Sequence, residues 1–295
     1  KSEVVDYIYG QMRKILTEAP VSYIKWDMNR AFSEVFSNGN DRAYQGKVRH
    51  NYILGVYSLY ERLIQEFPDV LFESCASGGA RFDPGMLHYA PQAWTSDDTD
   101  AVERIKIQYG TSYVYPLSSM GSHVSASPNH QIFRSTSLET RGNVAYFGTF
   151  GYELDITKLT EKELEQMKEQ ITFMKQHRDL IQKGEFYRLE SPFKGNQAAW
   201  EVVAKDGSEG LMAYFRVRQP IQGKLERIYF SGLEETKAYE VRECFGEKTD
   251  FGVHYGDELM YVGFSVSDCS SGLVGVARTG QGDGYSRLFH FRKVN

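Results

Sequence analysis

The sequence is poor in cysteine, with only three in 295 residues: Cys75, Cys244 and Cys269. An odd number of cysteines does not suggest a disulfide framework, and these three share none of the spacings by which cysteines bind zinc. We therefore expect no disulfides, no metal site and a reducing, cytoplasmic compartment.

Long apolar runs and clusters of positive charge are also missing. No window approaches the roughly 18 consecutive apolar residues of a membrane-spanning helix, and the first residues lack the pattern of a signal peptide. The net charge is −5, and no stretch carries a run of basic residues. Nucleic-acid binding depends on such positive charge. The sequence therefore argues against both a membrane protein and a nucleic-acid-binding protein.

Aromatic residues, in contrast, are abundant. The chain has 20 Tyr, 18 Phe and 3 Trp, within an overall composition of 41% hydrophobic and 25% charged residues. That composition is typical of a folded protein. Many of the aromatic side chains must lie in the core, and a surplus in a cleft would suit a ligand with flat apolar faces, such as a sugar.

The first part of the chain alternates helix-like and strand-like segments. Apolar residues recur every three or four positions in the helix-like segments, whereas the strand-like segments are short β-branched and aromatic runs. Thr160 followed by Glu163 has the form of a capping box at the start of a long helix. We predict helices over 4–16, 48–67, 100–109 and 160–182, and strands over 21–26, 70–74, 93–96, 113–117 and 144–147.

Such alternation is typical of a parallel α/β architecture. Five strands are too few for a closed eight-stranded barrel, which needs about 250 residues. The pattern by itself therefore leaves two interpretations, a smaller open sheet or a barrel without its first three units. Because the chain begins with Lys1 and runs directly into a helix-like segment, we expect the natural gene product to begin earlier.

After Gly184 the pattern changes to short strands separated by turns. The pair Asp206-Gly207 between two apolar runs is a strong hairpin signal. We therefore predict two domains, an α/β domain over 1–184 and an antiparallel β-sandwich over 185–295. Strands of the second domain are predicted over 198–204, 210–218, 227–230, 238–244, 260–266 and 286–292.

Acidic residues follow two of the predicted strands, where a parallel α/β fold carries its functional groups. Asp27 ends the first strand, and the ammonium group of Lys25 would stabilise its charged form, as a nucleophile requires. The ordinary preference of Asp for strand-to-loop junctions, or a surface ion pair, explains Asp27 alone at least as well.

A cluster of carboxyl groups follows the strand over 93–96. Mutual repulsion among Asp97, Asp98 and Asp100 would favour one carboxyl group that keeps its proton, as a general acid does. Helix capping is the alternative, because Asp in the first turn complements the helix dipole. Capping can account for Asp98 or Asp100 while Asp97 carries out the chemistry.

The glycine-containing stretch over 75–81, with the sequence CASGGAR, lacks the forms found in nucleotide-binding loops. We expect its glycines to let the backbone approach a ligand closely. Cys75 has no histidine nearby in the sequence, so a contact or core role is favoured over a nucleophilic one.

Five longer segments carry a family resemblance. They are YIKWDMNR (23–30), RHNYILGVYSLYERL (49–63), ESCASGGARFDPGML (73–87), WTSDDTDAVERIKIQYG (94–110) and PLSSMGSHVSASPNHQ (116–131). Together, and in this order, they resemble the α-galactosidases of glycoside hydrolase family 36. The resemblance implies the C-terminal part, strands 4 to 8, of a TIM (β/α)8 barrel followed by an antiparallel β-sandwich domain.

The resemblance also implies a chemistry. Asp27 would be the nucleophile and Asp97 the acid/base of a retaining, exo-acting α-galactosidase that hydrolyses terminal α-D-galactosyl residues of melibiose- or raffinose-type oligosaccharides. Double displacement needs no metal or organic cofactor, and it predicts carboxyl groups about 5 to 6 Å apart. The implied substrate contacts are Lys25, Trp26, Met28, Asn29, Cys75 and Gly78.

Two alternatives stay open at this point. The same scaffold would serve an α-galactosyl transferase or an α-N-acetylgalactosaminidase. The chain could instead be a non-catalytic piece, because the family carries a large β-sandwich and three barrel strands before the region that resembles this chain. An open sheet edge would then favour self-association. For the intact enzyme, the resemblance suggests a homo-oligomer.

Overall fold

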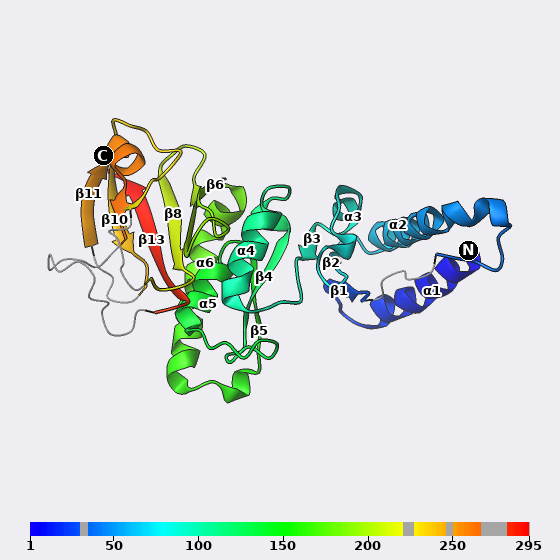
Figure 1. Ribbon diagram of the computed structural model, residues 1–295. Coiled ribbons are helices and arrows are strands. Elements are labelled where there is room, and N and C mark those ends of the chain that lie inside the picture. Colours follow the sequence, from blue (N-terminus) through cyan, green and yellow to red (C-terminus); the bar gives the residue numbers. More distant parts are fainter. Residues whose placement is uncertain (30–34, 221–226, 246–249, 267–281, 295) are drawn as a thin grey trace. The chain divides into compact units, whose positions relative to one another are not determined.

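The computed structural model describes most of the chain, in two compact units, Lys1–Asp97 and Asp98–Asn295 (Figure 1). Within the described residues, no helix combines the length and apolar character needed to cross a membrane. Arg30 and Cys269, both included in the sequence patterns, lie outside the described residues. The described ranges are 1–29, 35–220, 227–245, 250–266 and 282–294.

The described residues of the first unit form three parallel strands and three α-helices. Strand β2 pairs with β1 on one side and with β3 on the other, and both pairings are parallel. Helices connect the strands because a parallel pairing requires the chain to return before the next strand begins. The elements are α1 (Ser2–Glu18), β1 (Tyr23–Asp27), a 3-10 helix (Arg42–Lys47), α2 (Val48–Glu66), β2 (Leu71–Cys75), a 3-10 turn (Gly79–Arg81), α3 (Pro84–Tyr89) and β3 (Gln92–Trp94).

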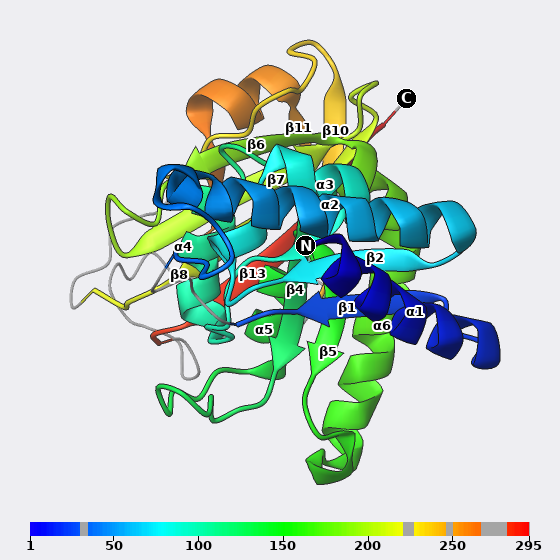
Figure 2. The same ribbon diagram turned by 90° about the vertical axis from the view of Figure 1, so that its right-hand side faces the viewer.

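These elements confirm the helices and strands predicted for this part of the chain, with slightly shifted boundaries. Figure 1 shows α1 and α2 side by side, and the two helices are in contact. Figure 2 shows β1 next to β2, in agreement with their hydrogen-bonded register. The alternating pattern of the sequence was therefore a sound guide to this unit.

Alternate side chains of β1 face toward and away from the core of the first unit. Tyr60 of α2 and Phe72 of β2 are almost fully buried, and Trp26 of β1 packs against the same cluster. Successive side chains of a strand point to opposite faces. Lys25 and Asp27 therefore lie on the face of β1 that is turned away from this cluster.

The second unit opens with two parallel strands and three helices. Asp100 caps the first of these helices by accepting from the backbone N–H groups of Val102 and Glu103, so its predicted capping role is confirmed. The predicted capping box is also confirmed, since Thr160 and Glu163 each accept from the other's backbone N–H. The elements are α4 (Ala101–Thr111), a 3-10 turn (Leu117–Ser119), β4 (Met120–Ser125), α5 (Leu138–Ala145), β5 (Thr149–Glu153), a 3-10 turn (Ile156–Lys158) and α6 (Glu161–Lys183).

Two of the strands predicted in this region are wrong. Segment 113–117 is turn and bend and ends in the 3-10 turn Leu117–Ser119, after which β4 begins. Segment 144–147 begins inside α5, and β5 follows that helix. Nearly every residue of α5 is buried. The short apolar run VAYF over 144–147 is equally consistent with a strand and with the buried end of a helix, so periodicity cannot separate them.

The remainder of the second unit is an antiparallel β-sandwich. Six strands form one sheet in the order β11-β10-β13-β8-β7-β6, and β12 pairs with β9 in a small second sheet. Ile228 and Phe264 of the small sheet share a buried cluster with Tyr214 and Phe289 of the large one. The strands are β6 (Glu185–Glu190), β7 (Gln197–Val203), β8 (Glu209–Arg216), β9 (Arg227–Ile228), β10 (Ala238–Glu243), β11 (Asp250–Tyr255), β12 (Phe264–Ser265) and β13 (Tyr285–Lys293).

The hairpin predicted at Asp206-Gly207 is confirmed, with Gly207 at a φ of +64° in the turn between β7 and β8. The sequence patterns missed β6 and β11, which stand at the two ends of the large sheet's strand order. Of the strand predicted over 260–266, only Phe264–Ser265 is a strand in the structure, as β12. The residues before it belong to a π-helical turn, Glu258–Val262. Edge strands and short helical turns carry weak apolar alternation, which explains these differences.

Replacing Thr160 with Ala removes the hydroxyl group that accepts from the backbone N–H of Glu163 at 3.3 Å. Loss of such a cap lowers the free energy of unfolding by about 1 kcal/mol. Urea denaturation followed by circular dichroism should show this loss, whereas Thr160→Ser, which keeps the hydroxyl, should remain close to the parent protein. Equal losses in the two variants would contradict the role of the hydroxyl.

Candidate active site

The carboxyl ends of β1 and β2 lie next to each other. Asp27, the last residue of β1, is the register partner of Cys75, the last residue of β2. The backbone N–H of Met28 donates to the carbonyl of Cys75 at 2.9 Å, which extends the pairing beyond β1. Two sequence-predicted site residues, 48 positions apart in the chain, are thereby brought together.

Asn29 connects Asp27 to the loop that follows β2. Its Nδ2 donates to Oδ2 of Asp27 at 2.7 Å. Its Oδ1 accepts from the backbone N–H of Ser77 at 3.1 Å and from the Ser77 hydroxyl at 3.0 Å. The amide therefore holds one carboxylate oxygen of Asp27, while the Asp27 side chain remains exposed and open to a ligand.

Both candidate carboxyl groups affect the pKa of the Cys75 thiol. The pKa of Cys75 is raised to about 12, chiefly by burial and also by a hydrogen bond with Asp27 and by the charges of Asp27 and Asp97, while the charge of Lys25 lowers it. The thiol is therefore protonated at neutral pH and serves as a donor beside Asp27. This agrees with the expectation that Cys75 is no nucleophile.

A hydrogen bond connects Asp97 to the last residue of β3. Nε1 of Trp94, the last residue of β3, donates to Oδ1 of Asp97 at 3.1 Å. The ammonium group of Lys25 lies 4.3 Å from the centre of the Trp94 ring, at cation–π distance. Lys25 thus reaches from β1 to the aromatic residue that holds Asp97.

A strained turn after β2 lies against the backbone that leads to Asp97. Ser77 and Gly78 have φ values of 50° and 89°, a region that costs a residue with a side chain about 1–3 kcal/mol. A Cβ atom on Gly78 would lie 2.6 Å from the carbonyl oxygen of Thr95 and 3.0 Å from Cα of Ser96. Only glycine permits this approach between the two loops.

Trp26 and Met28 are also predicted substrate contacts, and in the structure their side chains contact helix α2. The ring centre of Trp26 lies 4.7 Å from that of Tyr60 in α2. The sulfur of Met28 accepts from the hydroxyl of Tyr52, also in α2, at 2.7 Å. Both side chains therefore pack toward the helix, because the alternation of β1 gives the other face to Asp27.

Arg81 is a residue of this site to which the sequence patterns assigned no role. Its buried guanidinium group donates through Nη2 to the carbonyl of Trp26 at 3.0 Å and to that of Cys75 at 2.5 Å. It therefore joins the ends of β1 and β2. The sequence shows an arginine after a glycine pair, but nothing in the spacing reveals that it is buried or which carbonyls it binds.

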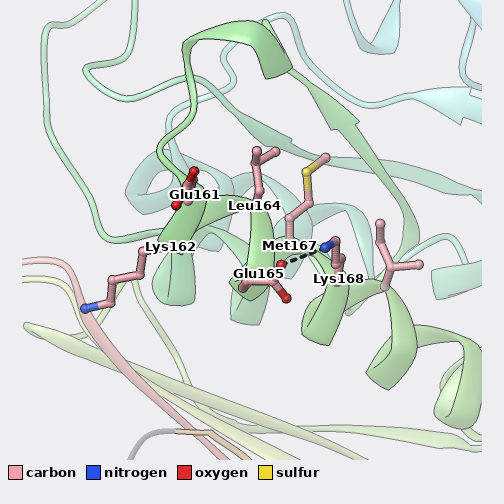
Figure 3. A pocket seen from close by; sticks show the side chains of 7 residues that line it. Glu161, Lys162, Leu164, Glu165, Met167 and Lys168 are labelled. Atoms are coloured by element: carbon pink, nitrogen blue, oxygen red, sulfur yellow. Dashed lines mark hydrogen bonds and ion pairs between the residues drawn. The ribbon is translucent and has the colours of Figure 1, made fainter.

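Shallow grooves elsewhere on the surface contain none of the predicted site residues. One lies along α6 and is lined by Glu161, Leu164 and Met167 together with other residues of the same helix (Figure 3). Glu165 and Lys168, which also line it, form an exposed ion pair at 2.6 Å. Among the residues that the structure describes, no group of three or more His, Cys, Asp or Glu side chains could hold a metal ion.

Comparison with known families assigns both parts of the chain. The Melibiase family model matches residues 1–184, and the model of the glycosyl hydrolase family 36 C-terminal domain matches residues 197–291. The chain belongs to glycoside hydrolase family 36. The resemblance carried by the five sequence segments is therefore confirmed.

Curated relatives of this family 36 chain are considerably longer than it is. Alpha-galactosidase AgaA of Geobacillus stearothermophilus is 51% identical over 274 residues, which cover 93% of this chain and 37% of the relative. Alpha-galactosidase Mel36A of Lactobacillus acidophilus is 42% identical over 298 residues, covering 100% of this chain and 38% of the relative. The chain thus spans less than two fifths of the length of these relatives.

Solved structures of family 36 share the fold. The alpha-galactosidase of Lactobacillus brevis has a TM-score of 0.91 at 47% identity, and AgaA in complex with raffinose has a TM-score of 0.90 at 48% identity. In each case the match covers 100% of this chain and 38% of the solved chain. The predicted fold class, the C-terminal part of a TIM barrel followed by an antiparallel β-sandwich, is confirmed.

Replacing Gly78 with Ala should disturb this family 36 site, because the new Cβ would clash with the backbone at Thr95 and Ser96. The strained φ alone should lower the free energy of unfolding by about 1–3 kcal/mol. Gly46→Ala is the matched control, since nothing lies within 4 Å of its added Cβ. Thermal and urea unfolding of both variants measure the difference, and equal stability would contradict the close approach.

Alkylation by iodoacetamide should be slow at Cys75, because its raised pKa leaves little thiolate near about pH 8.5, where an ordinary thiol is half ionised. Asp27→Asn removes a negative charge and should lower the pKa of Cys75, so alkylation should accelerate. Mass spectrometry of the peptide that contains Cys75 measures the rate. Asp69→Asn, at an exposed site of the same unit, should leave the alkylation rate of Cys75 unchanged. An alkylation rate that Asp27→Asn does not change would refute the contact between Cys75 and Asp27.

Proposed function

We propose that this chain carries the two catalytic carboxyl groups of a retaining, exo-acting α-galactosidase. The observation that carries the proposal is geometric: Asp27 ends β1 opposite Cys75 of β2, and Asp97 is bound by Trp94 at the end of β3, the strand that pairs with β2. The names of the relatives support the activity, and a raffinose complex of one relative supports a galactoside substrate. Terminal α-D-galactosyl residues of melibiose- or raffinose-type oligosaccharides are the proposed substrates.

The proposed reaction is a double displacement. Asp27 attacks the anomeric carbon while Asp97 gives its proton to the leaving oxygen, and the electron pair of the broken C–O bond goes to that oxygen. In the second step Asp97 takes a proton from water, and the water oxygen displaces Asp27 from the anomeric carbon. Two inversions give net retention, and neither step calls for a cofactor.

The hydrogen bonds around Asp27 suit a nucleophile. Asn29 binds Oδ2 at 2.7 Å, which leaves Oδ1 as the oxygen that attacks. The Cys75 thiol donates to the same carboxyl group, so a second donor holds Asp27 in place. We propose Lys25, Asn29, Cys75 and the backbone at Gly78 as galactose contacts, and we leave out Trp26 and Met28 because they pack against α2.

The proposal extends to the domains and the oligomeric state of the intact protein. We propose that residues 1–184 form the catalytic part and residues 185–295 the β-sandwich domain. Additional chain like that of the longer relatives would complete the barrel, and the intact enzyme is predicted to be a cytoplasmic homo-oligomer. Light scattering of the intact protein measures the oligomeric state directly.

Asp27→Asn should abolish hydrolysis of an aryl α-galactoside, because the amide cannot form the galactosyl-enzyme. The parent protein should release α-galactose first, which NMR of the newly formed anomeric proton detects. Asp69→Asn, which alters an exposed carboxylate just before the amino-terminal end of β2, opposite the end that carries Cys75, should retain activity. β-Galactose as the first product would refute retention.

Absence of turnover in the parent chain would call for the same set of variants in an N-terminally extended protein. A second negative result there would refute the α-galactosidase proposal. Transfer of galactose to a sugar acceptor in preference to water, or activity confined to an N-acetylated substrate, would instead favour the related transferase or α-N-acetylgalactosaminidase.

A further inference from the structure

The indole of Trp94 binds the carboxyl group proposed as the acid/base. Trp94 is 2% exposed, and its Nε1 donates to Oδ1 of Asp97, three residues further along the chain, at 3.1 Å. The indole N–H can only donate a hydrogen bond. The bond therefore favours an unprotonated Oδ1, and the proton of the neutral carboxyl group is favoured on Oδ2.

We propose that Trp94 is a positioning residue that selects Oδ2 of Asp97 as the proton-delivering atom. The inference rests on the proposed function, since it assigns Asp97 as the acid/base. A carboxylic acid that rotates freely presents its proton in several directions, and only one of them faces the leaving oxygen. Binding Oδ1 removes this freedom before the substrate arrives.

The indole is itself held from several sides. The ammonium group of Lys25 lies 4.3 Å from the ring centre and is attracted by the negative face of the aromatic ring. The backbone that joins Trp94 to Asp97 lies against Gly78, so close that a single Cβ would clash with Thr95. The donor, the connecting turn and the carboxyl group therefore form one constrained unit.

The hydrogen bond gains strength as the reaction proceeds. In the first step the proton leaves Oδ2 for the glycosidic oxygen, which receives the electron pair of the breaking C–O bond. Asp97 becomes a carboxylate, and the N–H of Trp94 then donates to a charged acceptor. Hydrogen bonds to ionised groups are shorter and stronger than neutral ones. An interaction that grows toward the transition state lowers the barrier.

The hydrogen bond can be tested without any activity. The chain has 3 Trp, so a sample labelled with ¹⁵N in its indoles gives a simple NMR spectrum, in which Trp94→Phe identifies the resonance of Trp94. Asp97→Ala should move this resonance upfield and leave that of Trp200 in β7 unchanged. Asp98→Ala is the matched control and should not move it. A Trp94 resonance that is insensitive to Asp97→Ala would overturn the proposal.

The positioning role is tested by the dependence on the leaving group in the intact enzyme. Trp94→Phe should lower kcat/KM for raffinose by about 10- to 100-fold, part of the 10²- to 10⁴-fold that general acid catalysis typically supplies. A dinitrophenyl α-galactoside has a leaving group that needs no proton. Trp94→Phe should therefore lower the rate at which this substrate forms the galactosyl-enzyme far less. A merely structural role would reduce both rates equally, and that result would overturn the proposal.

A second variant guards against misfolding. Benzothienylalanine at position 94 keeps the volume of the fused ring and removes only the N–H, so it should reproduce the selective loss on raffinose. Full activity of this variant on raffinose would refute the proposal. If the intact parent enzyme hydrolyses neither substrate, the proposed function fails, whereas the NMR result still decides whether Trp94 binds Asp97.

Discussion

The hydrogen-bonded register between β1 and β2 is the constraint on which the candidate site depends. It sets Asp27 opposite Cys75 and places Asn29 where it can reach the next loop. A slip of one residue would exchange the two faces of β1 and bring Trp26 to the face of Asp27. Arg81 opposes such a slip, because one guanidinium nitrogen binds backbone carbonyls from both strands.

Within the part of the chain that the structure describes, neutral donors hold the two candidate carboxyl groups. An amide N–H of Asn29 binds Asp27, and the indole N–H of Trp94 binds Asp97. The nearby cation, Lys25, lies over the Trp94 ring. A neutral donor fixes an oxygen in place without neutralising its charge, which leaves each carboxyl group free to take part in bond formation or proton transfer.

Local sequence signals predicted several parts of the fold well. The capping box at Thr160, the N-cap at Asp100 and the turn at Gly207 each depend on residues close together in the chain, so spacing alone reveals them. The strands predicted over 113–117 and 144–147 were wrong for the opposite reason. Burial of α5 comes from tertiary packing and includes its polar residues Thr140, Arg141 and Asn143, so polar and apolar positions do not mark an exposed and a buried face of this helix.

The sequence by itself determined the family and the strand ends that carry Asp27, Cys75 and Asp97, because motifs and strand periodicity are local properties. Only the tertiary structure decided that Trp26 packs on α2 and that Trp94 binds Asp97. Which face of a strand is buried, and which side chains meet across neighbouring strands, depends on packing between segments far apart in the chain. The spacing of residues along the sequence does not contain that information.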